Sequence, residues 1–266
     1  MASVSATTSS DRIARRFAEL RSGGRRALVP YITAGHPDAP RTIELLHALA
    51  AAGADVIELG LPFSDPLADG PIIQASSQRA LEGGMNFDAL LELVARANVS
   101  VPLVLFSYLN PLLAAGSDAL ERAASAGFDG LLITDLPVGA EPQREAELSA
   151  GPLAFIRLVA PTTPANRMRE IAAHGSGFVY LISRLGVTGV RDELPPELPQ
   201  TVKRLRGATT LPVCVGFGVS RPDQAAAVAR IADGVVVGSA MVRAAGESVD
   251  RAAALARDLR AAIDAA

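Results

Sequence analysis

Several residue types on which folds and enzymes often depend are scarce in this sequence. It has a single cysteine, Cys214, so no internal disulfide can form, which fits a reducing, cytoplasmic location. Cys214 lies in an apolar run and is interpreted as a small buried residue. No apolar run reaches the length of about 18 residues that a membrane-spanning helix needs. We therefore expect no membrane span.

Lysine and histidine are scarce as well. The only lysine, Lys203, falls in a predicted helix, which argues against a Schiff-base aldolase and against a pyridoxal phosphate site in this chain. The three histidines do not converge, because His36 is in a loop while His47 and His174 are on predicted helices. We therefore expect no metal site. The net charge of −3 shows no basic excess, so we expect no nucleic-acid partner.

Apolar, strand-like runs are abundant, and they alternate with alanine-rich helical stretches. Hydrophobic residues make up 49% and charged residues 20% of the chain, as in globular proteins with ample core material. We predict strands at residues 27–33, 55–59, 103–107, 130–134, 154–159, 177–183, 213–215 and 234–237. Predicted helices include 40–51, 87–97, 118–126, 164–174, 221–229 and a closing helix at 248–265.

This alternation predicts an α/β fold with parallel strands and right-handed crossovers. The strands are apolar on both faces, as in a sheet covered by helices. About eight such units predict a single (β/α)8 barrel over residues 11–266. The rival is a doubly wound open sheet, but residues 34–37 lack the spacing of a dinucleotide fingerprint. Gly53, Gly127 and Gly175 are predicted to end helices in the left-handed conformation.

The N-terminus precedes the barrel pattern. Residues 1–10 are mostly Ser, Thr and Ala, and we interpret them as a flexible tail in preference to a transit peptide. Ile13, Phe17 and Leu20 follow at helical spacing. The sequence therefore predicts an extra N-terminal helix before the first strand.

The segment DVIELGLPFSDPLADGP, residues 55–71, holds the most informative acids. Glu58 lies within an apolar strand, where an unpaired carboxylate is costly and needs a reason. Asp65 and Asp69 follow in a loop rich in Gly, Pro and Ser. Because barrel chemistry lies at the carboxyl ends of the strands, Glu58 and Asp69 are predicted to face one pocket as an acid–base pair. Glu58 should have a pKa raised by burial, and Asp69 should stay ionised on a more solvated loop.

Glycines after the last two strands predict a phosphate site. Phe217 and Gly218 follow the seventh strand, and Gly238 and Ser239 follow the eighth. In barrels these loops often bind phosphate through backbone N–H groups at a helix N-terminus, and glycine lets the backbone come close. Either of these two glycine-containing segments, taken alone, could be only a turn.

The segment 183–192 is long for a strand-to-helix connection and contains two glycines, so we predict a lid. Gly189 could donate its amide to the phosphate. The alternative is a surface loop with no role. The pocket walls are predicted from residues near the strand ends, any of which could equally be ordinary core: Tyr31, Phe106, Tyr108, Leu132, Thr134 and Tyr180.

The motif ELGLPFSDPLADGP resembles the signature of the tryptophan synthase alpha subunit, an indole-3-glycerol-phosphate lyase. Other segments match this family in the same order, and the resemblance extends from about residue 12 to the C-terminus. These segments are LVPYITAGHP, SYLNP, TDLPV, YLISRLGVTG, VGFGVS and VVGSA.

The resemblance implies cleavage of indole-3-glycerol phosphate to indole and glyceraldehyde 3-phosphate. It assigns the two catalytic acids to Glu58 and Asp69, ring contacts to Tyr108 and Tyr180, and a contact with the Asp69 loop to Thr188. It also implies a beta subunit partner in an α2β2 tetramer. That partner, not this chain, would hold pyridoxal phosphate. Positions resembling the family's partner contacts are Pro62, Asp65, Asn110, Pro111 and Pro137.

Three other functions stay open at this point. The chain could be a free-standing lyase that releases indole without a partner, or a non-catalytic activator that keeps only the fold. It could also be another phosphate-binding barrel, such as an isomerase or epimerase. Retention of both Glu58 and Asp69 argues against the activator. The PFSDPLADGP segment argues against the isomerase.

Overall fold

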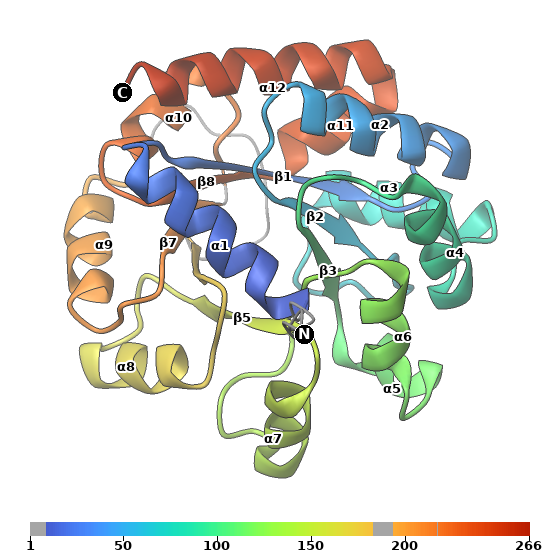
Figure 1. Ribbon diagram of the computed structural model, residues 1–266, viewed down its shortest axis with the longest axis horizontal. Helices are drawn as coiled ribbons and strands as arrows, with labels where there is room; N and C mark the ends of the chain where they lie inside the picture. Colours follow the sequence, from blue (N-terminus) through green and yellow to red (C-terminus); the bar gives the residue numbers. More distant parts are fainter. Residues whose placement is uncertain (1–8, 183–193, 217) are drawn as a thin grey trace, which may run out of the picture.

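Eight parallel strands close into a barrel in the computed structural model, which describes residues 9–182, 194–216 and 218–266 (Figure 1). Strand order follows chain order, and β8 pairs with β1 to complete the closure. This confirms the predicted (β/α)8 barrel. The strands are β1 (Ala27–Thr33), β2 (Ile57–Gly60), β3 (Leu103–Ser107), β4 (Gly130–Ile133), β5 (Ala154–Val159), β6 (Val179–Ile182), β7 (Val213–Gly216) and β8 (Gly234–Val237).

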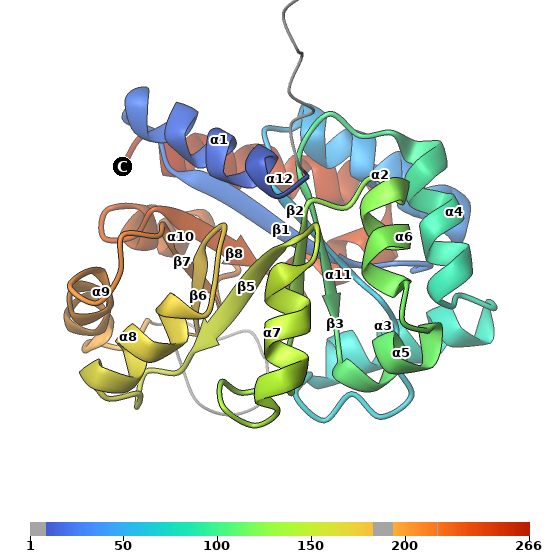
Figure 2. The same cartoon turned by 60° about the horizontal axis from the view of Figure 1, so that its bottom comes forward.

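Helices surround the barrel on its outer side (Figures 1 and 2). The barrel is preceded by α1 (Ser9–Ser22). The helices that follow are α2 (Ala39–Ala51), α3 (Pro71–Glu82), α4 (Phe87–Ala97), α5 (Leu109–Ala115), α6 (Ala119–Ala126), α7 (Pro142–Ala150), α8 (Ala165–Ala173), α9 (Leu198–Arg206), α10 (Pro222–Ala229), α11 (Ser239–Glu247) and α12 (Val249–Asp264). In the part of the chain that the structure describes, none of them combines the length and apolarity needed to cross a membrane.

The strands alternate between two apolar environments. Leu28, Ile57 and Leu59 face the surrounding helices, within the larger core cluster. Val29 and Val56 face the barrel interior, within a second cluster. Period-two alternation of a strand therefore places apolar residues on both sides, because helices cover the outer side and the barrel encloses the inner one.

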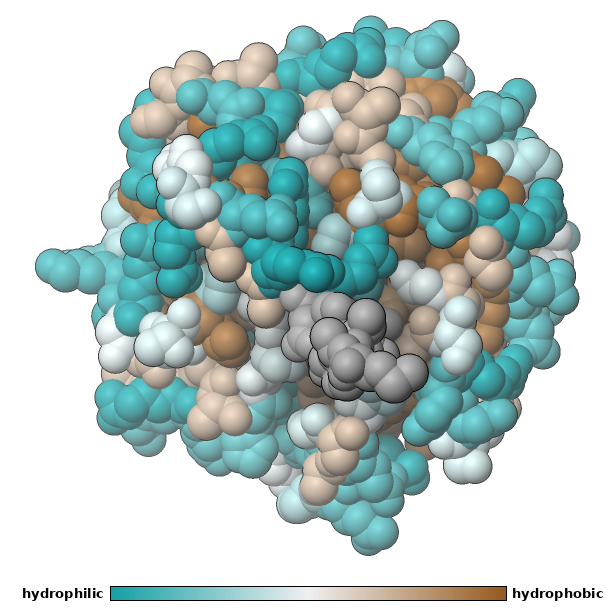
Figure 3. Space-filling view, viewed as in Figure 1, coloured by the Kyte–Doolittle hydropathy of each residue, from teal (hydrophilic) through white to brown (hydrophobic). Residues whose placement is uncertain are grey.

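Helix α1 packs at the amino end of the barrel, as its apolar spacing predicts. Ile13, Phe17 and Leu20 are buried within the inner cluster, and the Phe17 ring lies 5.6 Å from that of Phe178. Figure 1 shows α1 lying across the barrel. The face that carries α1 is mostly hydrophilic, with apolar side chains showing between the helices (Figure 3). This helix closes one end of the barrel, which leaves the other end for the site.

The same pair of hydrogen bonds precedes every second strand of the barrel. A polar residue lies just before β2, β4, β6 and β8. Its side chain accepts a hydrogen bond from a backbone N–H at the start of the preceding strand. Its own backbone N–H donates to the carbonyl of that same strand residue. The side-chain acceptors are Asp55 for Leu28 (2.8 Å), Asp129 for Leu103 (3.0 Å), Ser176 for Phe155 (2.9 Å) and Asp233 for Val213 (2.9 Å). Each pair satisfies two buried backbone groups and fixes the strand register.

Arginines neutralise the aspartates that make these hydrogen bonds. Asp55, which is fully buried, contacts Arg16 of α1 at 2.5 Å and Arg260 of α12 at 2.9 Å. Asp129 contacts Arg12 of α1 at 3.0 Å. The paired charges compensate the cost of burying the carboxylates and attach the two terminal helices to the strand starts.

One predicted helix exit was wrong. Gly53 and Gly127 have the expected positive φ, at +97° and +118°. Gly175 does not, and the left-handed residue is Gly177, at +74°. The requirement at Gly175 is close approach, since a Cβ there would lie 2.8 Å from Cγ of the buried Arg157.

Candidate active site

Glu58 lies in the middle of β2 and faces the barrel interior. Its neighbours Ile57 and Leu59 face the helices, and its register partners are Tyr31 on β1 and Val104 on β3. The side chain is 1% exposed, and its buried Oε1 atom has no hydrogen-bond partner among the described residues. Burial raises the pKa of Glu58 to about 8, because desolvation penalises the charged carboxylate. At neutral pH the group is therefore protonated and able to donate.

Asp69 ends the loop between β2 and α3, and it is more enclosed than the sequence predicts. The side chain is 6% exposed, whereas Asp65 on the same loop is exposed. Burial raises the pKa of Asp69 to about 6, and a hydrogen bond from the Tyr108 hydroxyl acts in the opposite direction. Asp69 is thus the more exposed of the two acids and has the lower pKa, in the predicted order, although it is largely buried. Two turns shape its loop: Leu67 N–H donates to the Asp65 carbonyl, and Asp69 N–H donates to the Pro66 carbonyl.

Both acids open onto one cavity at the carboxyl end of the barrel. The cavity is lined by Tyr31, Glu58, Asp69, Ile73, Phe106, Tyr180, Gly218, Gly238 and Ser239. All of these except Ile73 are among the site residues predicted from the sequence. The volume is about 30 Å³, enough for one water molecule.

Ile73 is a lining residue that sequence reasoning missed. It lies in the first turn of α3, directly after the acidic loop, and packs with Tyr31 and Val242. From the sequence alone, an apolar residue in the first turn of a helix is interpreted as an ordinary core residue. Its position, four residues after Asp69, could have identified it. If the acid lies at the pocket, the first turn of the helix that follows lies beside the pocket too.

Two glycines that end strands make room for tyrosine rings. A Cβ on Gly60 would lie 2.2 Å from the Tyr31 hydroxyl, and a Cβ on Gly216 would lie 2.4 Å from the Tyr180 hydroxyl. Each ring thus lies across the end of the next strand and forms part of the cavity wall. The Tyr31 ring meets Phe106 edge-on at 5.0 Å. The need for glycine beside these rings was not predicted from the sequence, because the constraint comes from a neighbouring strand.

The glycines after β7 and β8 meet at the N-terminus of α11. Gly238 is the N-cap of α11 and Ser239 is its first residue. Gly218 has a φ of +93°, which favours glycine. A helix of nine residues that begins at the cavity presents unpaired N–H groups and the positive end of its dipole. This arrangement can hold a phosphate without a lysine.

The remaining predicted residues lie elsewhere. Tyr108 is 4% exposed and contacts Asp69 without lining the cavity. Leu132 is fully buried in the inner cluster, and Thr134 is half-buried with its hydroxyl 3.4 Å from the Ser107 carbonyl. The last three residues, Thr188, Gly189 and Phe217, lie outside the described residues, as does the predicted lid.

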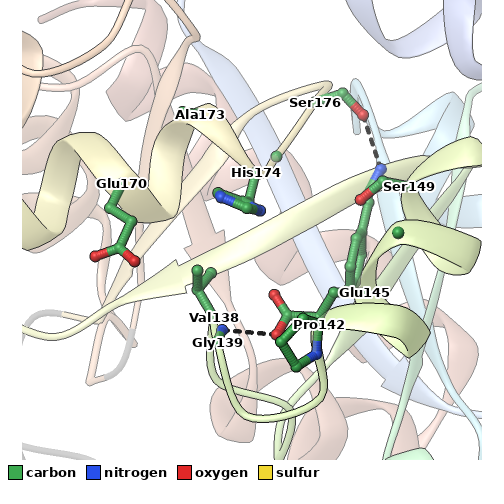
Figure 4. Close-up of a pocket in the computed structure, with 12 residues that line it drawn as sticks. Val138, Gly139, Pro142, Glu145, Ser149, Glu170, Ala173, His174 and Ser176 are labelled. Carbon is green, nitrogen blue, oxygen red and sulfur yellow. Dashed lines mark hydrogen bonds between the residues drawn. The ribbon is translucent and has the colours of Figure 1, made fainter.

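Larger hollows elsewhere do not have this chemistry. A cavity of about 410 Å³ lies between α7 and α8 (Figure 4), but its buried Glu145 is bonded to Arg157 at 2.7 Å and to Gly139 N–H at 2.7 Å. A groove of about 430 Å³ at the rim is lined by residues that include Pro62 and Asn110. Among the described residues, no group of His, Cys, Asp and Glu side chains could hold a metal ion.

Comparison with known proteins gives a single result. The family model described as tryptophan synthase alpha chain matches residues 17–265. The tryptophan synthase alpha chain of Carboxydothermus hydrogenoformans is 50% identical over 236 residues, covering 87% of this chain and 88% of the relative. That of Chloroflexus aggregans is 47% identical over 266 residues, covering 96% and 98%.

Solved structures agree with this result. Tryptophan synthase from Mycobacterium tuberculosis superposes with a TM-score of 0.87 at 37% identity, covering 95% of this chain and 98% of that one. Tryptophan synthase subunit alpha from Legionella pneumophila gives a TM-score of 0.87 at 36% identity, covering 98% and 100%. The match extends over nearly the whole barrel, including the strand ends that carry the two acids. The chain belongs to the tryptophan synthase alpha chain family.

Proposed function

We propose that the cavity at the carboxyl end of the barrel is the active site and that Glu58 and Asp69 are its two catalytic carboxylates. As a member of its family, the chain is a carbon–carbon lyase that cleaves indole-3-glycerol phosphate and pairs with a beta chain. The observation that carries the residue assignment is the separation of the two pKa values, about 8 and about 6, within one cavity. Two carboxyl groups with separated pKa values can take an acid role and a carboxylate role at the same pH.

Glu58 would act first as an acid and then as a base. Its proton goes to C3 of the indole ring, which leaves an electron-poor ring with positive charge on nitrogen. The resulting carboxylate then takes the proton of the side-chain hydroxyl next to C3. The carbon–carbon bond breaks, its electron pair returns to the ring, and the products are neutral indole and an aldehyde. Glu58 ends protonated, as it began, so protons balance over the cycle.

Asp69 would hold the indole N–H and stabilise the positive charge that develops on the ring. This requires the ionised form, which is the majority form above pH 6. The α11 N-terminus, with Gly218, Gly238 and Ser239, would hold the phosphate of the glycerol side chain. The rings of Tyr31 and Tyr180 would flank the indole. Thr188, Gly189 and Phe217 keep their proposed contacts with the acidic loop and the phosphate.

The proposed chemistry needs only carboxylates, so it requires no cofactor from this chain. Pyridoxal phosphate would belong to the beta chain, as the resemblance implies. A cytoplasmic location is part of the same proposal, and it is supported by a lone cysteine that is fully buried.

A direct assay for indole released from indole-3-glycerol phosphate tests the site. Glu58→Gln and Asp69→Asn should each lower turnover by about 10² to 10⁴, the usual contribution of a positioned acid or base. The exposed Asp65 on the same loop provides a matched control, since Asp65→Asn makes the same chemical change outside the cavity. Turnover of Asp69→Asn as high as that of Asp65→Asn would refute the assignment of Asp69.

A further inference from the structure

Tyr108 contacts the Asp69 loop at three points. Its hydroxyl donates to Oδ2 of Asp69 at 3.0 Å and accepts the backbone N–H of Ala68 at 2.9 Å. Its ring packs against Phe63, at the start of the same loop, with centroids 5.2 Å apart. One side chain therefore contacts both ends of the loop as well as the carboxylate.

Tyr108 is itself fixed to the barrel. It follows β3 directly, and Ser107 before it accepts the N–H of Thr134 at 3.0 Å. Leu109 after it donates its N–H to Asp135 at 2.8 Å. These bonds join Tyr108 to the ends of β3 and β4, which belong to the rigid closed sheet.

Among the described residues, the Gln74 side chain also holds the loop, and it donates to the backbone carbonyl of Pro66 at 3.4 Å. Gln74 donates to the backbone carbonyl of Asp69 at 2.9 Å, a bond that does not involve the carboxylate. Leu67, at the tip of the loop, is 87% exposed. Within the described ranges, the Tyr108 hydroxyl is the one side-chain donor that bonds to the Asp69 carboxylate. The position of that carboxylate therefore depends on Tyr108.

We propose that Tyr108 is a positioning residue for the reaction, whose hydroxyl holds the Asp69 carboxylate in its charged form at the edge of the cavity. The proposal rests on the proposed role of Asp69. It differs from the ring contact that the family resemblance implies, because Tyr108 does not line the cavity and would act on substrate only through Asp69.

The surroundings of Asp69 make this hydroxyl important. Glu58 from β2 lines the same cavity as Asp69, and Tyr31 from β1, Tyr180 from β6 and Tyr108 interact with its charge. None of these can supply a positive charge, and no described cation faces the carboxylate. Burial raises the pKa of Asp69, and the hydroxyl of Tyr108 is what opposes that rise. Removing the hydroxyl should therefore move the pKa of Asp69 above about 6.

The test is Tyr108→Phe, which keeps the ring against Phe63 and removes only the hydroxyl. A hydrogen bond to a charged group corresponds to a pKa change of about one to two units. The kcat/KM for indole-3-glycerol phosphate should then fall by about five- to fiftyfold at pH 6 but less than about twofold at pH 8.5. The matched control is Tyr31→Phe, which removes another hydroxyl at the same cavity, one that lies 3.5 Å from Thr33. Its ratio to wild type should not vary with pH in this way.

A second measurement is independent of activity. In protein carrying ¹³C at the aspartate carboxyl carbons, the Asp69 resonance should titrate at higher pH in Tyr108→Phe than in wild type. An unchanged Asp69 titration, or a loss of activity equal at pH 6 and pH 8.5, would overturn the proposal. Asp69→Asn separates the two ideas. If it remains active, the proposed role of Asp69 fails; if it is inactive while Tyr108→Phe behaves as wild type, only the role of Tyr108 fails.

Discussion

Replacing Glu58 with glutamine should destroy activity and stabilise the fold, and both effects follow from the same burial. With a pKa of about 8, roughly 90% of Glu58 is protonated at pH 7, against roughly 0.3% for a group with the ordinary value. Burial therefore enriches the proton-donating form by a factor of about 300. Glutamine has nearly the same shape but can neither give nor take a proton, so turnover should fall by about 10² to 10⁴.

The stability change has a defined sign and pH range. The pKa of Glu58 is raised in the folded state, so its stabilising effect is complete below about pH 4.5 and is lost as pH rises through about 8. Wild type should lose up to about 5 kcal/mol of unfolding free energy over that range, which corresponds to about 1.4 kcal/mol for each pKa unit. Glu58→Gln does not ionise and avoids this loss. Its advantage over wild type should grow by about 2 to 3 kcal/mol between pH 6 and pH 8.5.

Urea unfolding followed by circular dichroism at both pH values measures this advantage. The matched control is Glu44→Gln, which makes the same chemical change at an exposed position on α2. An equal advantage of Glu58→Gln at pH 6 and pH 8.5 would refute the argument that Glu58 is neutral when folded. Activity within a few-fold of wild type would refute its catalytic role.

Three further outcomes are expected. The kcat/KM should follow a bell-shaped curve, rising through about pH 6 as Asp69 ionises and falling through about pH 8 as Glu58 loses its proton; a flat profile would contradict the assignment. Gly218→Val, at a φ of +93° beside the proposed phosphate site, should raise KM far more than it lowers kcat, and a dephosphorylated substrate should be insensitive to it. Asn110→Arg, at the rim groove, should leave basal indole release unchanged and remove acceleration by a beta chain, as measured by turnover and size-exclusion chromatography with and without that chain.

The sequence predicts the barrel well because its signals are local. Strands β1, β3, β5 and β8 match the predicted ranges at every residue, as does helix α4. Each is an apolar run bounded by turn residues or caps. Strand β2 begins two residues later than predicted, because the Asp55 side chain accepts the backbone N–H of Leu28 just before the strand starts. The predicted ranges did not include helices α3, α5, α7, α9 and α11. Helix α5 is short and contains Pro111, so its periodicity is weak.

The site is only partly readable from sequence because its details depend on distant contacts. The acids and the glycines after β7 and β8 are visible at the strand ends. The hydrogen bond that the Asp69 carboxylate accepts comes from Tyr108, which lies 39 positions further along the chain. The need for glycine at position 60 depends on a tyrosine of the neighbouring strand. No local pattern contains such information, since it arises only when the barrel closes.

The two carboxylates differ in how firmly the fold sets their properties. Glu58 lies on a strand that is hydrogen-bonded on both sides, and the rise of its pKa follows from burial. Asp69 lies on a loop, and its pKa reflects burial opposed by one hydrogen bond, so a shift of the loop changes both its position and its charge. Regulation of turnover should therefore act through Asp69. The rim groove includes Phe63, whose ring packs on Tyr108, so a partner bound there would contact the residue next to this hydrogen bond. On the proposed roles, the barrel fixes the acid Glu58, and the carboxylate of Asp69 is the one that a partner can adjust.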